Sequence, residues 1–453
     1  MKQEIPRIVL AGTDSGCGKT AVTCALLKAL INKGLKVSAF KCGPDYIDPM
    51  FHKKVIGARS SNLDLFLFNK NTLKYLLAKN SENYDISVIE GMMGLYDGIG
   101  MSFKTSTHEI SITTKSPVIL IINAGGAALS LMAKIKGFTD FTEKNQICGV
   151  ILNKINPATY NMLGLEKEIL KQFKGKVIPL GCLPYIKDSS IESRHLGLVT
   201  ANEISDLKEK VEALAEQTAK TIDLEAVIKI AKSAPSLSFD SISFPRNPEG
   251  VRIAVARDNA FCFYYEDSLD ILEEMGAELI PFSPLNDRFL PENINGLYLG
   301  GGYPELYAKE LSENKSMLGS IREALENNLP CIAECGGFMY LLEFIDRFPM
   351  VGYLPGKCYD TKKLSRFGYV TLTSNSSSML CKKGEKITGH EFHYWDCEYP
   401  GSSFTAVKDS GRGWSCVHSS DTLYAGYPHF HFYSNPDFAV NFYKSCLKEK
   451  END

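Results

Sequence analysis

Three features are missing from this 453-residue sequence, and each absence excludes a class of protein. There is no excess of positive charge, since 50 Lys and Arg residues stand against 53 Asp and Glu residues, so nucleic acid is not an expected partner. No apolar run approaches the roughly 18 residues that cross a bilayer, and the first residues do not form a signal peptide. The 13 cysteines are odd in number and contain no C-x-x-C pair. We therefore expect a cytoplasmic protein with reduced thiols and no membrane partner.

The length predicts more than one domain, because a domain commonly takes about 150 residues. Short β-branched runs such as RIVLAG and SPVILIINA alternate with helix-periodic stretches, a pattern typical of parallel sheets covered by helices. A stretch rich in Ser, Pro and Asn interrupts this alternation, which restarts with VRIAVARD. We predict an α/β protein with two doubly wound domains: a P-loop parallel-sheet domain at 1–232, a linker at 233–249 and a second domain at 250–453.

A glycine-rich turn, GTDSGCGKT, follows the first predicted strand and precedes an amphipathic helix. Backbone N–H groups of such a turn point at phosphate oxygens, a lysine reaches the outer phosphates, and a threonine hydroxyl binds Mg²⁺. The strict pattern has glycine where this chain has Thr13, with the glycine one residue earlier, and the alternative is a purely structural turn. We predict ATP contacts from Gly12, Thr13, Gly16, Gly18, Lys19 and Thr20.

Four carboxylates follow the next strands, at the sheet edge where open α/β folds bind ligands. Asp45 and Asp48 lie in KCGPDYIDP, and Glu90 and Asp97 lie in EGMMGLYDG. We expect Thr20, Asp45 and Glu90 to hold Mg²⁺ against the phosphates. Asp45 and Asp48 are also candidate catalytic groups, unless they only cap turns, and Asp97 is a candidate substrate contact. The glycine-rich turn is similar to that of the dethiobiotin synthetase family, whose members activate a carboxylate with ATP.

Three further residues are candidates for ligand contact in the first half. Asn153 ends the strand ICGVILNKI, where related nucleotide folds have an asparagine that faces adenine. Arg194 and His195, in ESRHLGL, follow the last strand of this half. We predict that they contact an anionic substrate, the alternative being a solvated pair.

In the second half, Cys335 lies between an apolar strand and the pair Gly336–Gly337, which begins a helical segment. This turn resembles the nucleophile elbow of the class I glutamine amidotransferase family, which implies a domain of that type at 250–453. Because the N-terminal end of a helix lowers the pKa of a thiol, we expect Cys335 to be reactive. The glycine run Gly300–Gly302 is expected to donate N–H groups to an oxyanion.

A cysteine nucleophile needs a base, and the sequence YPHFHF supplies His429 and His431. Residues two apart on a strand share a face, so both are candidates, and analogy with related glutaminases favours His429. No acidic third member follows the histidine, which favours a Cys–His dyad. His390 and His393, on either side of Glu391, point to opposite faces of a strand, which favours substrate binding or support of the site over a metal.

Eight segments in order resemble the cobyrinic acid a,c-diamide synthase family over nearly the whole chain: GTDSGCGKT, KCGPDYIDP, EGMMGLYDG, RHLGL, GGGYPE, AECGG, GHEFHY and HFHF. The resemblance implies amidation of the a and c acetate side chains of a corrin, with glutamine as nitrogen donor and ATP with Mg²⁺ as activator. It also implies an acyl phosphate intermediate. The alternatives are the same amidation on nickel sirohydrochlorin and a partitioning-type P-loop ATPase that switches a partner. A homodimer through exposed strands of the second domain is compatible with the sequence.

Overall fold

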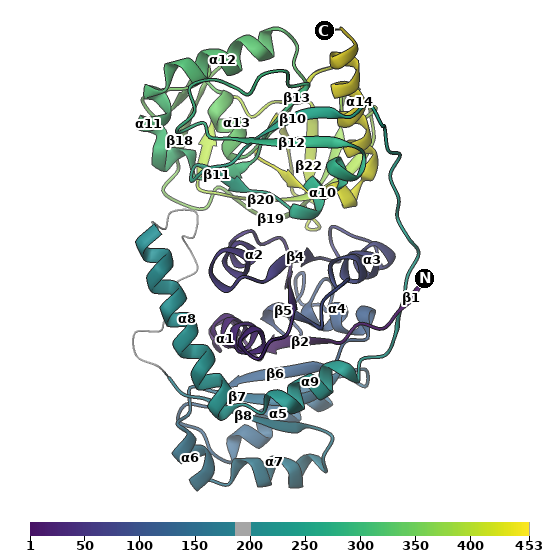
Figure 1. The fold of residues 1–453 in the computed structure, drawn as a ribbon, viewed down its shortest axis with the longest axis vertical. Helices are drawn as coiled ribbons and strands as arrows, with labels where there is room; N and C mark the ends of the chain where they lie inside the picture. The colour runs from purple at the N-terminus through teal and green to yellow at the C-terminus, as the bar shows by residue number, and fades with distance from the viewer. Residues whose placement is uncertain (186–200, 453) are drawn as a thin grey trace. The chain divides into compact units, whose positions relative to one another are not determined.

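The computed structural model describes residues 1–185 and 201–452, and the chain divides into two compact units (Figure 1). Unit 1 comprises Met1–Ile242 and unit 2 comprises Ser243–Asp453. The division lies inside the segment 233–249, where the sequence loses its periodic apolar positions. Each unit contains a mainly parallel sheet with helices packed against it, which confirms the predicted α/β class.

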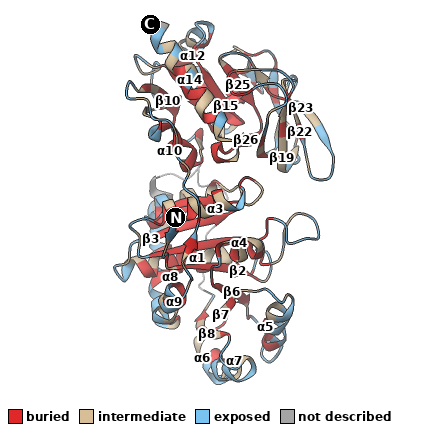
Figure 2. Cartoon of the chain, turned by 90° about the vertical axis from the view of Figure 1, so that its right-hand side faces the viewer, coloured by how far each residue is buried: buried red, intermediate tan, exposed pale blue. Residues whose placement is uncertain are grey.

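The sheet of unit 1 has seven strands in the order β4-β3-β5-β2-β6-β7-β8, and every strand pair in it is parallel. Its central strands are mostly apolar and buried almost throughout, as expected for a sheet covered on both faces (Figure 2). The edge strand β4 is polar in sequence, RSSNL, although most of it is buried. The carboxyl ends of β2, β3, β5 and β7 therefore meet at one edge. The strands are β2 (Arg7–Gly12), β3 (Val37–Cys42), β4 (Arg59–Leu63), β5 (Ile86–Gly94), β6 (Val118–Asn123), β7 (Ile147–Asn153) and β8 (Ile178–Leu183).

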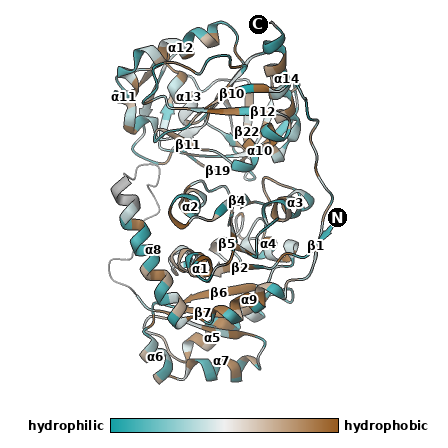
Figure 3. Cartoon of the chain, viewed as in Figure 1, coloured by the Kyte–Doolittle hydropathy of each residue, from teal (hydrophilic) through white to brown (hydrophobic). Residues whose placement is uncertain are grey.

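The helices of unit 1 bury one apolar side each. Helix α1 contributes Val22, Leu26 and Leu30 to a core shared with the sheet and with α8 and α9, so its predicted apolar face is the packed one. Figure 3 shows the difference between buried and outer residues, with hydrophobic β6 and β7 beside helices whose outer residues are hydrophilic. The helices are α1 (Lys19–Asn32), α2 (Ile47–Phe51), the π-helical turn η1 (His52–Ile56), α3 (Lys70–Asn80), α4 (Thr107–Thr114), α5 (Ser130–Asp140), α6 (Pro157–Met162), α7 (Leu165–Phe173), α8 (Ala201–Thr221) and α9 (Leu224–Lys232). A two-stranded ladder pairs β1 (Lys2–Gln3) with β9 (Leu237–Ser238).

Unit 2 has a six-stranded sheet in the order β12-β10-β13-β15-β25-β24, parallel except for the pair β24–β25. A second sheet has five strands in the order β23-β22-β19-β20-β26, and every strand pair in it is antiparallel. The six strands are β10 (Val251–Ala256), β12 (Ala277–Phe282), β13 (Gly296–Leu299), β15 (Cys331–Glu334), β24 (His418–Ser419) and β25 (Leu423–Gly426). The five are β19 (Arg366–Ser374), β20 (Lys386–His393), β22 (Phe404–Val407), β23 (Gly413–Cys416) and β26 (His429–Phe430).

Smaller elements complete unit 2. Its helices are α10 (Glu266–Glu274), η3 (Pro304–Tyr307), α11 (Ala308–Glu313), α12 (Lys315–Glu326), α13 (Gly336–Leu341), η4 (Phe432–Ser434) and α14 (Pro436–Asn452). Its short strands are β11 (Phe261–Phe263), β14 (Gly301–Gly302), β16 (Phe344–Ile345), β17 (Phe348–Pro349), β18 (Lys357–Asp360) and β21 (Trp395–Cys397).

Two findings bear on the compositional expectations. Within residues 1–185 and 201–452, no helix has both the length and the apolar character that a bilayer crossing requires. All 13 cysteines fall in this described part, and no disulfide joins any of them there.

Candidate functional site

The turn between β2 and α1 has the backbone of a phosphate-binding loop. Gly16 and Gly18 both have φ near +89°, a conformation that glycine adopts at little cost. A Cβ at Gly18 would lie 2.1 Å from the side-chain nitrogen of Asn153, so any larger residue there would displace Asn153. Helix α1 begins at Lys19 without a side-chain cap, which leaves its first N–H groups available to an anion.

Lys19 and Thr20 connect this loop to β5. The Lys19 ammonium donates to the carbonyl oxygen of Met93 at 3.0 Å, and the Thr20 hydroxyl donates to Glu90 Oε1 at 2.8 Å. Burial, together with the charge of Lys41, lowers the pKa of Lys19. The carbonyl oxygen that accepts from Lys19 carries no formal charge. A phosphate bound at the loop would supply a negative charge beside this ammonium group.

Below the loop lies a buried ionic cluster made of Lys41, Asp48, His52 and Glu90. Lys41 Nζ is 2.9 Å from Glu90 Oε1 and also donates to Asp48 Oδ2, and His52 Nε2 is 3.4 Å from Glu90 Oε2. Every member is less than a tenth exposed, so these charges balance one another rather than being screened by water.

The charges of this cluster set its pKa values. Burial alone lowers the pKa of Lys41, but Glu90 and Asp48 outweigh burial and hold that pKa well above its usual value. Burial raises the pKa of Glu90, yet Lys41 and His52 reverse the effect and keep its pKa low. For Asp48, burial and the neighbouring Glu90 charge outweigh Lys41 and raise its pKa to about 6. Glu90 is thus the fixed anion of the cluster, and Asp48 is the carboxylate that titrates near neutrality.

Two of the three predicted Mg²⁺ ligands lie together. Thr20 and Glu90 are in contact, and among the described residues the buried Glu90 Oε2 has only the long 3.4 Å ion-pair contact with His52 Nε2. This donor set fits a magnesium ion, which commonly takes one or two protein oxygens and completes its shell with phosphate and water. Asp45 is placed differently, because its Oδ1 accepts from the N–H groups of Ile47 and Asp48 and so caps the start of α2. The described residues contain no group of three or more His, Cys, Asp or Glu side chains arranged for a metal.

The side chains of Asn153 and Asp97 form hydrogen bonds with backbone groups of nearby turns. Asn153 donates to the carbonyl oxygen of Cys17 at 2.8 Å, and it is 5% exposed, so it supports the phosphate loop from below. Asp97 accepts from the N–H of Gly94 at 2.9 Å in the turn that follows β5. The predicted substrate contacts Arg194 and His195 lie outside the described residues.

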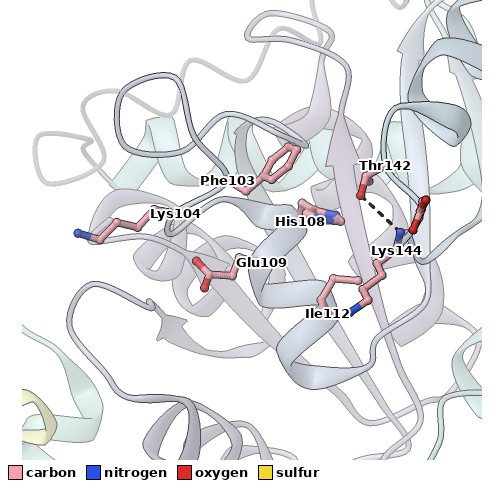
Figure 4. A pocket seen from close by; sticks show the side chains of 8 residues that line it. Phe103, Lys104, His108, Glu109, Ile112, Thr142 and Lys144 are labelled. Carbon is pink, nitrogen blue, oxygen red and sulfur yellow. Dashed lines mark hydrogen bonds between the residues drawn. The ribbon is translucent and has the colours of Figure 1, made fainter.

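An open pocket of about 660 Å³ lies elsewhere on unit 1, and none of the predicted site residues lines it (Figure 4). Two lysines and two glutamates share its wall with aromatic and apolar groups, so it offers no single sign of charge. The lining residues are Phe103, Lys104, His108, Glu109, Ile112, Thr142, Glu143 and Lys144.

In unit 2, Cys335 lies between β15 and α13 with φ +48° and ψ −101°, a conformation that is unusual for a residue other than glycine. A Cβ at Gly337 would lie 2.2 Å from the carbonyl oxygen of Leu299, and one at Gly336 would lie 3.1 Å from the nitrogen of Gly302. The glycines therefore let the turn pack directly against the glycine run, as expected of a nucleophile elbow. Gly300 itself donates to the Tyr264 hydroxyl at 2.8 Å, which leaves Gly301 and Gly302 as the expected oxyanion donors.

The expected low pKa of the Cys335 thiol is wrong for this structure. Burial raises the pKa of Cys335, and the nearby carboxylates of Glu305 and Glu391 raise it further, while the N–H of Gly336 only partly offsets them. Helix α13 has six residues, so its dipole is small beside the cost of burying a thiolate. The thiol therefore needs a base to become a nucleophile.

His429 is better placed than His431 to be that base. A Cβ at Gly301 would lie 2.4 Å from His429 Cε1, so the ring adjoins the glycine run that packs on the nucleophile turn. β26 ends at Phe430, so the two histidines do not share a strand face as the spacing suggested. His431 instead caps η4 by accepting from the N–H of Tyr433 at 3.2 Å.

A carboxylate that the sequence reasoning missed contacts His429. Glu334, the residue before the nucleophile, has Oε2 3.0 Å from His429 Nδ1. The sequence did contain a signal for it, because Glu334 ends an apolar strand, where a buried carboxylate requires a partner. Sequence reasoning also missed Lys41 and His52, the two residues that lie beside the carboxylate of Glu90.

His390 and His393 have different surroundings, as their spacing predicts. The His390 ring stacks on His429 with centroids 5.2 Å apart, and burial lowers the pKa of His390 well below its usual value. His393 Nε2 lies 2.8 Å from Glu391 Oε2, and its ring stacks on Tyr427 at 4.1 Å.

Comparison with protein families gives two matches that together span most of the chain. Residues 8–199 match the CobQ/CobB/MinD/ParA nucleotide binding domain, and residues 252–437 match the CobB/CobQ-like glutamine amidotransferase domain. The first match contains the phosphate loop and the buried ionic cluster, and the second contains Cys335 and His429.

Curated relatives match over nearly the full length. A cobyrinate a,c-diamide synthase of Clostridium acetobutylicum is 42% identical over 95% of this chain and 98% of its own length. Proteins of the same name from Caldanaerobacter subterraneus and Thermoplasma volcanium are 40% and 38% identical over 97% and 98% of this chain, and each is covered over 98% of its length. The similarity to solved structures is weak and carries no argument. The PurLQS structure of Thermotoga maritima, for example, has a TM-score of 0.32 and 17% identity, and the match covers 44% of this chain and 98% of that one.

Proposed function

Since this chain belongs to the cobyrinate a,c-diamide synthase family, we propose that it converts the a and c acetate carboxylates of cobyrinate to amides, with ATP as activator and glutamine as nitrogen donor. The chain is a glutamine-hydrolysing carbon–nitrogen ligase of cobalamin biosynthesis. Its nucleotide-binding domain and its amidotransferase domain supply the two half-reactions. The observation that carries the proposal is that each domain match contains its own chemical site.

In unit 1, we propose that a substrate carboxylate attacks the γ-phosphorus of ATP and forms an acyl phosphate. The N–H groups of the Gly12–Thr20 turn hold the phosphates, and Lys19 neutralises charge on the transferred group. Mg²⁺ bound with the nucleotide would shield the outer phosphate oxygens, and Thr20 and Glu90 are the residues that would hold it. Lys41 keeps Glu90 ionised for this purpose.

In unit 2, we propose that Cys335 attacks the side-chain amide carbon of glutamine while His429 accepts the thiol proton. His429 then gives this proton to the leaving nitrogen, so that ammonia departs and a thioester remains. Water, deprotonated by the same histidine, cleaves the thioester and releases glutamate. The N–H groups of Gly301 and Gly302 are proposed to stabilise the oxyanion of both steps.

Ammonia then attacks the acyl carbon and phosphate leaves. We propose that Asp48 takes the proton that the attacking nitrogen loses, because its pKa of about 6 leaves it ionised at neutral pH. Asp45, which caps α2, is proposed to hold Asp48 and its helix in place.

We also propose that the enzyme acts in the cytoplasm, where ATP and glutamine are available and where thiols stay reduced. The absence of any disulfide among the 13 described cysteines supports this location. A homodimer that pairs exposed strands of unit 2 is proposed as its assembly. Light scattering on the purified chain tests the assembly, because a monomer mass at micromolar concentration would rule it out.

The experiment that tests the function is mass spectrometry of cobyrinate incubated with the protein, ATP, Mg²⁺ and glutamine. We expect two acid-to-amide conversions per macrocycle and one ATP consumed for each. Parallel incubation with nickel sirohydrochlorin provides the matched alternative. Preferred amidation of the nickel macrocycle would reassign the substrate, and ATP hydrolysis without glutamate release would favour a switch ATPase.

A further inference from the structure

Glu334 has a buried carboxylate whose two oxygens have different partners. It ends β15 directly before Cys335 and is 2% exposed. Its Oε1 accepts from the Tyr298 hydroxyl at 3.0 Å, and its Oε2 lies 3.0 Å from His429 Nδ1. A chain of hydrogen bonds thus runs from Tyr298 on β13 through Glu334 to the ring of His429.

The partner of Nδ1 decides which nitrogen of His429 is basic. An ionised carboxylate only accepts hydrogen bonds, so Nδ1 carries a proton and the lone pair of the neutral ring is on Nε2. A Cβ at Gly301 would lie 3.1 Å from this Nε2 and 2.4 Å from Cε1. The basic edge of the ring therefore faces the glycine run, which packs against the turn that carries Cys335.

We propose that Glu334 is the positioning residue of the glutaminase base, a role that rests on the function proposed above. It holds His429 in the Nδ1–H tautomer, fixes the ring toward the nucleophile turn and stabilises the imidazolium that forms when Nε2 accepts the Cys335 proton. The unit thus has an acidic member after all, placed before the cysteine rather than after the histidine.

Other titratable groups around His429 do not replace Glu334. His390 on β20 stacks on the ring, but burial and the His429 charge lower the pKa of His390, which keeps it neutral. Tyr298 reaches the ring only through Glu334, and burial raises its pKa. Burial also raises the pKa of Glu334, and the hydrogen bonds with His429 and Tyr298 offset this only in part.

The test is Glu334→Gln in the full chain, assayed with glutamine and with ammonium chloride. We expect glutaminase kcat to fall by about 10²–10⁴-fold with a smaller change in KM, because the amide supports the wrong tautomer. Ammonium-driven amidation should stay within about twofold, since it bypasses His429. The pH profile of glutaminase kcat should also change, because the amide cannot stabilise the imidazolium of His429 as the carboxylate does.

Glu343→Gln is the matched control, because it makes the same change at another glutamate of unit 2, whose hydrogen bond is to the N–H of Gly356 at 2.8 Å rather than to His429. It should leave the glutaminase kcat and its pH profile unchanged. An unchanged kcat and pH profile for Glu334→Gln would overturn the inference, whereas a wild-type enzyme that hydrolyses no glutamine would overturn the proposed function instead.

A measurement on the wild type covers the case in which Glu334→Gln fails to fold. Nitrogen NMR of histidine-labelled protein at alkaline pH should report neutral His429 protonated at Nδ1, assigned by the loss of its signals in His429→Gln. Protonation at Nε2 would contradict a positioning role for Glu334.

Discussion

Lys41 and Glu90 lie opposite each other on the parallel strands β3 and β5, and their side chains form a buried ion pair. The pair is 2.9 Å long, and Glu90 also accepts from Thr20 in the first turn of α1. The register of the sheet thereby fixes the carboxylate beneath the phosphate loop.

Removing Lys41 should destabilise unit 1. In Lys41→Met, Glu90 and Asp48 lose their shared cation while remaining buried, and breaking a buried ion pair in this way costs about 3–5 kcal/mol of unfolding free energy. Urea unfolding followed by circular dichroism measures the change. Both tryptophans lie in unit 2, so their fluorescence reports separately on that unit.

Lys33→Met provides the comparison for that measurement. Lys33 pairs with Glu225 at 2.7 Å, but both side chains are largely exposed, and such pairs contribute about 0–1 kcal/mol. Equal losses for the two variants would contradict the structural role given to the buried cluster.

The titration of Asp48 should make stability depend on pH. Because burial raises its folded pKa to about 6 from 3.8, the stability that Asp48 contributes is complete below 3.8 and is lost as the pH rises through about 6. The melting temperature of the wild type should therefore fall relative to Asp48→Asn across this range. The corresponding difference in unfolding free energy between the two proteins should be no more than a few kcal/mol, since one pKa unit corresponds to about 1.4 kcal/mol. A difference that is constant with pH would show that Asp48 does not titrate there.

Gly18 and Gly16 form a matched pair of loop glycines. Both have φ near +89°, but a Cβ at Gly18 meets Asn153 at 2.1 Å, whereas one at Gly16 meets nothing within 4 Å. Gly16→Ala should cost only the roughly 1–2 kcal/mol of a left-handed residue. Gly18→Ala should in addition displace Asn153 and weaken ATP binding by more than about tenfold. Titration calorimetry with ATP tests this, and similar affinities for both variants would contradict the packing argument.

The sequence was sufficient to predict the features that depend on residues close together in the chain. The phosphate loop, the nucleophile turn and the alternation of strands and helices depend on residues close in sequence, such as Gly18 beside Lys19 and Cys335 beside Gly336. The sheet class followed from the same periodicities. The sequence also pointed correctly to Thr20 and Glu90 as neighbours, because parallel strands present their carboxyl ends at one edge.

Pairing between distant residues could not be predicted in this way. Lys41 and Glu90 are 49 positions apart and meet through the register of β3 and β5. Glu334 and His429 are 95 positions apart and lie in different sheets, so only the tertiary fold brings them together. The pKa of Cys335 was misjudged for a related reason, since burial and the carboxylates that raise it come from segments far away in the chain. The hydrogen bond from Asn153 to the phosphate loop, 136 residues earlier, was likewise not predicted.

Amide counting by mass spectrometry, with cobyrinate, ATP and either glutamine or ammonium chloride, tests most directly whether two separate sites serve one reaction. For Cys335→Ser we expect amidation with ammonium at close to the wild-type rate and at least a 1,000-fold loss, to order of magnitude, with glutamine. For Lys19→Ala we expect amidation to disappear with both nitrogen sources. Equal loss with both sources in Cys335→Ser, or retained amidation in Lys19→Ala, would contradict the division of chemistry between unit 1 and unit 2.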